Sequence, residues 1–143
     1  MTTHNADVAV VRRFLDEVVN GGRIDLIDQL WAPNLRWHGG SLGEVHGLAA
    51  FKTRLAAAAQ GAFSGMHLQV HDIFAADGKV AVRFTNSGIQ RGPFMGAPAT
   101  GKHAEWLGIA IYTVVNGKIV DAWFGEDVLG MMLQLGVVQL PTS

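Results

Sequence analysis

The sequence predicts an α+β fold in which helices come first along the chain and an antiparallel sheet follows. Apolar residues before position 60 recur three and four apart, as on one side of a helix. From Met66 onward the apolar residues alternate with polar ones, as in a half-buried strand. Dipeptides that favour tight turns separate the later segments. In this arrangement the helices cover one face of the sheet, and a strongly bent sheet closed by helices leaves a pocket.

Three N-terminal helices are predicted, over residues 5–20, 24–31 and 48–60. Asn5 can cap the first helix, and Gly21-Gly22 ends it. Pro33 ends the second helix, because proline has no backbone N–H to continue one. Residues 35–38 then form a short extended piece, and a glycine-rich loop leads from it to the third helix.

Four strands and a last helix follow, over residues 66–73, 79–90, 102–115, 118–124 and 128–135. Asp77-Gly78 marks the turn between the first two strands. Asn116-Gly117, the dipeptide that a type I′ turn prefers, joins the last two. The strands therefore form a meander, with the glycine- and proline-rich segment 92–101 as a lip over the pocket.

Length and composition indicate a single globular domain and argue against some kinds of partner. The 143 residues are enough for one domain, predicted to span 1–143, with a moderate core. Apolar residues make up 49% and charged residues 16%, and the net charge of −1 offers no footprint for nucleic acid or a membrane surface. There is no cysteine, no leader-like N-terminus and no long apolar run, so we expect a cytoplasmic protein.

Several motifs carry a resemblance to a known family. The first helix ends in Asn-Gly-Gly, and Trp-Ala-Pro-Asn leads into the first short strand. The last third reads Gly-Pro-Phe-Met-Gly-Ala-Pro-Ala-Thr-Gly-Lys, then Asn-Gly-Lys-Ile-Val-Asp-Ala-Trp, then Gln-Leu-Gly. This order resembles the SnoaL-like polyketide cyclases of the nuclear-transport-factor-2-like superfamily. The resemblance implies a cone-like barrel around one apolar pocket, cofactor-free chemistry and a homodimer.

One position departs from the cyclases. They use a buried aspartate to move a proton in an aldol ring closure, and alignment on the C-terminal motifs places Phe124 there. Phenylalanine cannot transfer a proton. Either another acid/base has taken over, or shape and apolar enclosure carry the reaction, or the protein only binds its ligand.

Strand alternation predicts the pocket wall, because side chains of one parity share a face. The apolar parity carries Phe84, Asn86, Trp106, Tyr112 and Phe124. A β-bulge would exchange Trp106 for Glu105, so this assignment stays open. Further expected substrate contacts are Trp37, Phe51, Met95 and Met132. The outer parity carries Leu107, Ile109, Ile111 and Trp123, which supports a homodimer.

Three titratable residues compete for acid/base work. His38 has a suitable pKa range and either contacts the ligand or bonds the neighbouring glycine-rich loop. Asp127 is either a base or the N-cap of the last helix. Glu105 either faces the pocket or belongs to a polar ladder outside, and Glu126 is expected to be solvated. Asn86 and Tyr112 would supply hydrogen bonds.

No metal site is expected. His67 and His71 lie four apart on a strand, roughly 13 Å from each other at about 3.3 Å per residue, too far for shared zinc ligation. We therefore predict a cofactor-free cyclase or rearrangement enzyme for a hydrophobic polyketide-like molecule. The alternatives are a non-catalytic binding protein and an isomerase or hydrolase with Asp127 or Glu105 as base.

Overall fold

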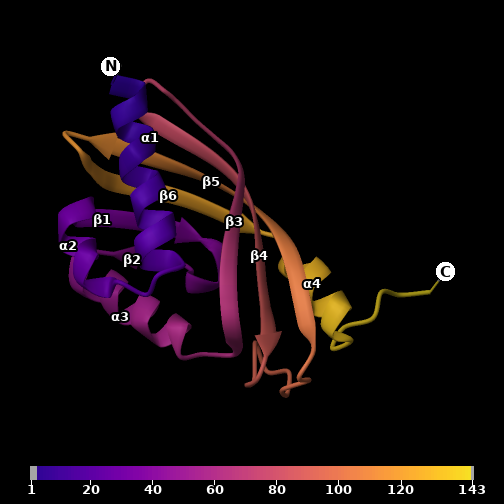
Figure 1. The fold of residues 1–143 in the computed structure, drawn as a ribbon. Helices are drawn as coiled ribbons and strands as arrows, with labels where there is room; N and C mark the ends of the chain where they lie inside the picture. Colours follow the sequence, from indigo (N-terminus) through magenta and orange to yellow (C-terminus); the bar gives the residue numbers. More distant parts are fainter. Residues whose placement is uncertain (1–2, 143) are drawn as a thin grey trace.

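The computed structural model describes residues 3–142 and confirms the α+β class (Figure 1). The helical elements are α1 (Thr3–Arg13), η1 (Phe14–Val19), η2 (Ile24–Leu26), α2 (Ile27–Leu30), η3 (Gly40–Leu42), α3 (Leu48–Ala59) and α4 (Val128–Leu135). The strands are β1 (Trp31–Gly39), β2 (Val45–His46), β3 (Phe63–Ala76), β4 (Lys79–Gln90), β5 (His103–Val115) and β6 (Lys118–Glu126).

The six strands form one curved sheet in the order β2-β1-β6-β5-β4-β3. The meander β3 to β6 is antiparallel, as predicted, but β1 pairs with β6 in parallel. The predicted antiparallel meander is confirmed, and the parallel pair is an addition that the sequence analysis did not predict. The reason is that β1 and β6 are joined through most of the chain, so no tight turn fixes their relative direction. The sheet curves without closing on itself, because β2 and β3 stand at its two edges.

Pairing with neighbours extends the strands beyond their alternating stretches. β1 begins at Trp31, whose backbone is extended with φ −117° and ψ 146°, so the second helix is shorter than predicted. β6 continues past Phe124 to Glu126, which lies opposite Gly108 of β5. This extension places Phe124 and Glu126 on the same face of the sheet.

The core lies between the sheet and the helices on its covered face (Figure 1). Phe14, Trp31, Phe51 and Tyr112 are each at most 1% exposed and pack their rings together. Burying each such side chain contributes roughly 1.5–3 kcal/mol. A smaller cluster, which includes Trp106, Met131 and Leu135, fixes α4 against β5.

The two hairpin turns have the backbone conformation that their dipeptides favour. Asn116 and Gly117 have φ of 51° and 78°, the two positive values that a type I′ turn requires. Asp77 and Gly78, with φ of 53° and 76°, form the turn between β3 and β4. Both turns lie where the dipeptides predicted them.

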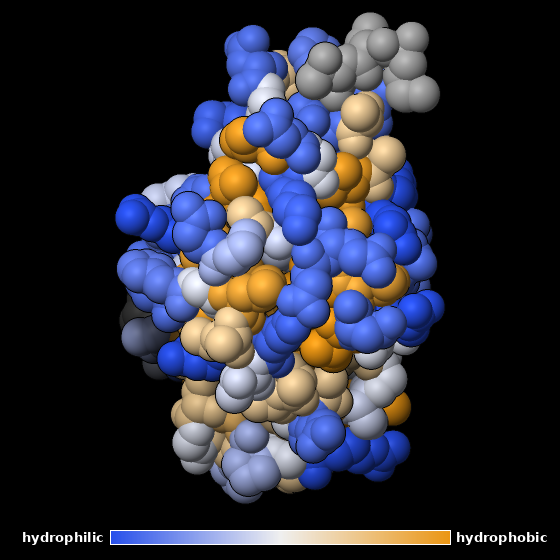
Figure 2. Space-filling model, turned by 90° about the vertical axis from the view of Figure 1, so that its left-hand side faces the viewer, coloured by the Kyte–Doolittle hydropathy of each residue, from blue (hydrophilic) through white to orange (hydrophobic). Residues whose placement is uncertain are grey.

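On the surface in Figure 2, hydrophilic side chains are interspersed with smaller hydrophobic patches. Within residues 3–142, none of the helices combines the length and the apolar character that crossing a membrane demands.

Candidate functional site

Two adjoining cavities lie between the sheet, α3 and the 92–101 loop. The outer one has a volume of about 380 Å³ and is lined by α3, the start of β3, the 92–101 loop and the start of α4. The inner one has a volume of about 130 Å³ and reaches η1 and the middle of the sheet. Both are lined by Ser41, Leu42, Ala58, Met66 and Glu126. They are therefore two chambers of one mostly apolar hollow, which meet at Glu126.

The Glu126 carboxylate is held by three donors. The Asn86 amide donates to Oε1 at 2.9 Å, and the Trp106 indole N–H donates to the same oxygen at 3.0 Å. The backbone N–H of Ser41 donates to Oε2 at 3.2 Å. Asn86 and Trp106 are nearly buried, so the carboxylate has a fixed position where the two chambers join. A carboxylate held in a mostly apolar hollow is a candidate general acid/base.

Local backbone geometry permits this arrangement. Gly40 has φ +62°, and a Cβ on it would lie 2.7 Å from Phe124 Cδ1 and 3.1 Å from Glu126 Oε2. Only glycine lets the η3 turn approach the end of β6 so closely. This approach delivers the Ser41 N–H to the carboxylate.

Tyr112 lines the inner chamber from β5. It is fully buried, and its hydroxyl has no hydrogen-bond partner among the described residues. Burial, and secondarily the charge of Glu126, raise the pKa of Tyr112 well above its usual value. The hydroxyl therefore stays protonated at neutral pH, as a donor beside the inner chamber that no described residue uses.

Half of the predicted site residues line the two chambers. Trp37, Asn86, Tyr112 and Phe124 line the inner one, and Met95 and Trp106 line the outer one. Trp106 faces inward and Glu105 outward, because the β4–β5 pairing runs without a bulge past this point. Met95 sits at the rim and is 71% exposed, whereas the neighbouring Phe94 packs inward against Phe63.

Three residues that were predicted to contact the substrate pack in the core instead. Phe51 is fully buried between Trp31 and Trp37. Phe84 is also fully buried, with its ring over Gly108, where a Cβ would overlap it. Met132 packs into the α4 cluster, and Met131, one position earlier, lines the outer chamber instead. The correct face of an element thus does not ensure that a side chain reaches the cavity.

The two candidate carboxylate bases line neither chamber, and for Asp127 the structure has the alternative role of helix cap that the sequence also allowed. Glu105 is exposed on the outer face of β5. The Gln134 side-chain amide accepts the Glu105 backbone N–H and donates to the Glu105 carbonyl oxygen. Asp127 is the N-cap of α4, because its Oδ1 accepts the Gly130 N–H at 2.8 Å. An N-cap accepts backbone donors that a helix leaves unpaired, and this explains the residue.

His38 lies on the outer side of the sheet, opposite to the predicted pocket position. Its Nε2 is 2.9 Å from Asp121 Oδ1, its Nδ1 is 2.7 Å from Glu44 Oε2, and its ring stacks on Trp123 with centroids 4.2 Å apart. The hydrogen bond to Glu44, followed by that to Asp121, raises the pKa of His38. Of the two alternatives for His38, the structure has the bond to the glycine-rich loop, through Glu44, and not the ligand contact. Trp37 points inward, so the next residue along the strand points outward.

Sequence reasoning missed Glu126 by assigning it to solvent. The available signal was parity: Glu126 lies two residues after Phe124 and shares its face if the strand continues. The predicted strand ended at Phe124, which removed Glu126 from consideration.

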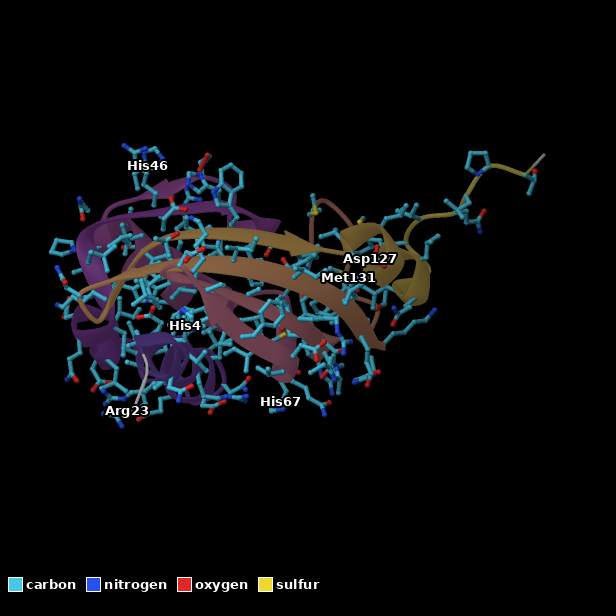
Figure 3. All side chains as sticks on the ribbon, turned by 90° about the horizontal axis from the view of Figure 1, so that it is seen from above. His4, Arg23, His46, His67, Asp127 and Met131 are labelled. Atoms are coloured by element: carbon cyan, nitrogen blue, oxygen red, sulfur yellow. The ribbon has the colours of Figure 1, made fainter. Side chains whose placement is uncertain are left out.

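No group of three or more histidine, aspartate or glutamate side chains with metal-binding geometry occurs within residues 3–142. Figure 3 shows His4, His46 and His67 well separated, and Asp127 and Met131 together on the α4 side of the sheet.

Several solved structures of other proteins share this architecture. The structures it resembles include a proposed SnoaL-like polyketide cyclase from Jannaschia sp. CCS1, with a TM-score of 0.84, 21% identity and 97% of each chain covered. AclR from Streptomyces galilaeus, a proposed hydroxylase, has a TM-score of 0.81 and 23% identity over 96% of this chain and 100% of its own. IdmH from Streptomyces antibioticus, a proposed polyketide cyclase, has a TM-score of 0.79 and 25% identity over 91% of this chain and 98% of its own.

No curated protein matches the sequence. A model of the SnoaL-like polyketide cyclases matches residues 9–135, which is most of the chain, including β1, the meander and α4. The chain therefore belongs to the SnoaL-like polyketide cyclase family.

Proposed function

We propose that this protein is a cofactor-free enzyme in which Glu126 moves a proton within a hydrophobic, polyketide-like small molecule, giving a cyclisation or a related rearrangement. The observation that carries the proposal is the Glu126 carboxylate, held by Asn86, Trp106 and the Ser41 N–H where two mostly apolar chambers meet. Family membership, and the likeness to IdmH, support the substrate class.

The proposed reaction balances without a further reactant. Glu126 takes a proton from a carbon next to a ketone, and the Tyr112 hydroxyl donates a hydrogen bond to the oxygen that becomes an enolate. The enolate carbon then attacks a second carbonyl of the same molecule, so that one carbon–carbon bond forms. The protonated Glu126 returns its proton to the new alkoxide.

Glu126 thereby replaces the acid/base that the alignment lacks at Phe124. The two residues are two positions apart on β6 and line the inner chamber together. Phe124 instead packs on Trp37 and Phe84, with ring centroids 4.9 Å and 5.1 Å away. The aromatic wall would hold an apolar chain in a reactive fold, and positioning of this kind can lower a barrier by about 7 to 11 kcal/mol at its upper end.

The test uses a panel of linear and polycyclic polyketide-like compounds, with the mass and retention time of each recovered compound compared with the input. We expect wild-type protein to alter at least one compound without added cofactor, and Glu126→Gln to slow this turnover by about 100-fold or more. Glu105→Gln, which removes a carboxylate from the outer face, is the matched control and should retain turnover. Tight binding with every compound recovered unchanged would make the protein a carrier and refute the proposal.

We also propose that two copies pair through the outer sheet face. Leu107, Ile109, Ile111 and Trp123 are exposed there, Trp123 by 60%, and the family resemblance favours a dimer. Light scattering at micromolar concentration should give twice the chain mass for wild type. Ile109→Glu should give a folded monomer, and a monomeric wild type would contradict the pairing.

A further inference from the structure

The two chambers carry one positive and one negative side chain. Among the described residues that line them, only Arg54 and Glu126 are charged. Glu126 lies where the chambers meet, whereas Arg54 lies on α3 and lines only the outer chamber. Arg54 is exposed, so it stands at the entrance and Glu126 stands further in.

Arg54 is held by a hydrogen bond to a backbone carbonyl and not by an ion pair with a carboxylate. Its Nη1 donates to the carbonyl oxygen of Leu42 at 2.7 Å, and Leu42 itself lines both chambers. Within residues 3–142 no aspartate or glutamate forms an ion pair with Arg54. A guanidinium has five N–H donors, so most of them remain for a ligand.

We propose that Arg54 binds a carboxylate at one end of the substrate, so that the cavity prefers an elongated apolar acid to its neutral ester. This inference rests on the proposed function in one respect: the remainder of the same molecule reaches Glu126. A guanidinium suits this role because its planar N–H pair matches the two oxygens of a carboxylate.

The opposite charges also fix the direction in which the substrate enters. A carboxylate placed deep in the hollow would face Glu126, and two like charges in an apolar space repel strongly. At the entrance the same group meets Arg54. The neutral end therefore goes inward, towards the buried Tyr112 hydroxyl and the aromatic wall.

The experiment compares anthraquinone-2-carboxylate with its methyl ester, two apolar probes that differ in the charge. Binding at pH 7.5 is followed by quenching of tryptophan fluorescence, since Trp37 and Trp106 line the chambers. We expect wild type to bind the acid about fivefold more tightly than the ester, the size of an exposed charge pair. Arg54→Gln should bring the two dissociation constants together by weakening the acid alone.

Lys52→Gln is the matched control. It removes one positive charge from the same helix, but Lys52 pairs with Asp28 and lines neither chamber. This variant should keep the preference for the acid, and circular dichroism should show all variants folded. An ester that binds wild type as well as the acid does, no binding of either probe, or an unchanged preference in Arg54→Gln would each overturn the proposal.

The outcome is separable from that of the proposed function. Glu126→Gln tests turnover, whereas the probe pair tests binding at the entrance. A retained acid preference with turnover unaffected by Glu126→Gln would refute the role of Glu126 and leave Arg54 as a carboxylate site. Loss of turnover in Glu126→Gln with equal binding of acid and ester would do the reverse.

Discussion

The indole N–H of Trp106 donates to Glu126 Oε1 across 3.0 Å, and this contact joins the first part of β5 to the end of β6 inside the cavity. The same oxygen accepts the Asn86 amide, so two side chains on neighbouring strands fix one carboxylate. Because Trp106 is 5% exposed, its N–H would otherwise be buried without a partner, which costs about 1 to 3 kcal/mol. The pair thus serves stability and carboxylate position together.

Trp106→Phe should therefore impair turnover more than it impairs folding. The ring remains to pack on Phe63, but Glu126 loses one of its three donors and becomes less well oriented. We expect turnover of a true substrate to fall by about tenfold, the equivalent of about 1.4 kcal/mol, with thermal unfolding shifted by only a few degrees. Trp123→Phe, on the outer face, is the control. Equal turnover in wild type and Trp106→Phe would contradict the positioning role.

Gly40→Ala should be more harmful than Gly65→Ala, a change in β3. Both glycines have a φ of +62°, so either alanine incurs backbone strain of about 1 to 2 kcal/mol. Only at Gly40 would the new Cβ meet Phe124 and Glu126, whereas nothing lies within 4 Å of it at Gly65. In urea unfolding, Gly40→Ala should lower the free energy of unfolding by about a further 1 to 3 kcal/mol, because the new Cβ overlaps its neighbours. Equal losses would mean that the turn moves away freely.

Alternation along the strands predicted much of the cavity wall. It placed Asn86, Tyr112 and Phe124 where they line the hollow. It left open whether Trp106 or Glu105 faces inward, because a bulge would exchange them, and the regular pairing of β4 with β5 decides for Trp106. It could not tell a wall residue from a core residue, since that depends on what lies opposite. Phe84 faces inward as expected, but it fills the space that Gly108 leaves in the neighbouring strand.

The strand ends were the weak point for the site. Glu126 belongs to β6 because it pairs with Gly108, a contact between strands that local sequence does not reveal. For His38 the sequence left ligand contact and a bond to the glycine-rich loop open, and alternation could have decided between them. The rule that puts Trp37 inside puts His38 outside, where it bonds Glu44 of that loop and stacks on Trp123. The parallel pairing of β1 with β6 joins segments far apart in the sequence, so local patterns do not predict it.

Asp127→Ala should lower stability and leave the chemistry intact. The Asp127 side chain caps α4 by accepting the Gly130 N–H, and loss of such a cap costs about 1 kcal/mol. Asp127→Asn keeps an acceptor and should restore most of this loss. Denaturant unfolding measures the cost, and turnover should stay within about twofold of wild type in Asp127→Asn. Lost turnover in a stable Asp127→Asn variant would return Asp127 to the list of acid/base candidates.

His38→Gln should reduce stability more at pH 6 than at pH 9. In the folded protein Glu44, and then Asp121, raise the pKa of His38, so folding favours its protonated form. That contribution is fully present below the unfolded pKa of about 6.5 and is lost as the pH rises through the higher folded value. His46 also faces this cluster, with its Nε2 3.9 Å from Glu44 Oε2, so His46→Gln should be measured beside it. His67→Gln, at an exposed site on β3, controls for the loss of a histidine elsewhere. A His38→Gln penalty that is the same at both pH values would mean that the cluster stabilises the fold through neutral hydrogen bonds and ring stacking, not through charge.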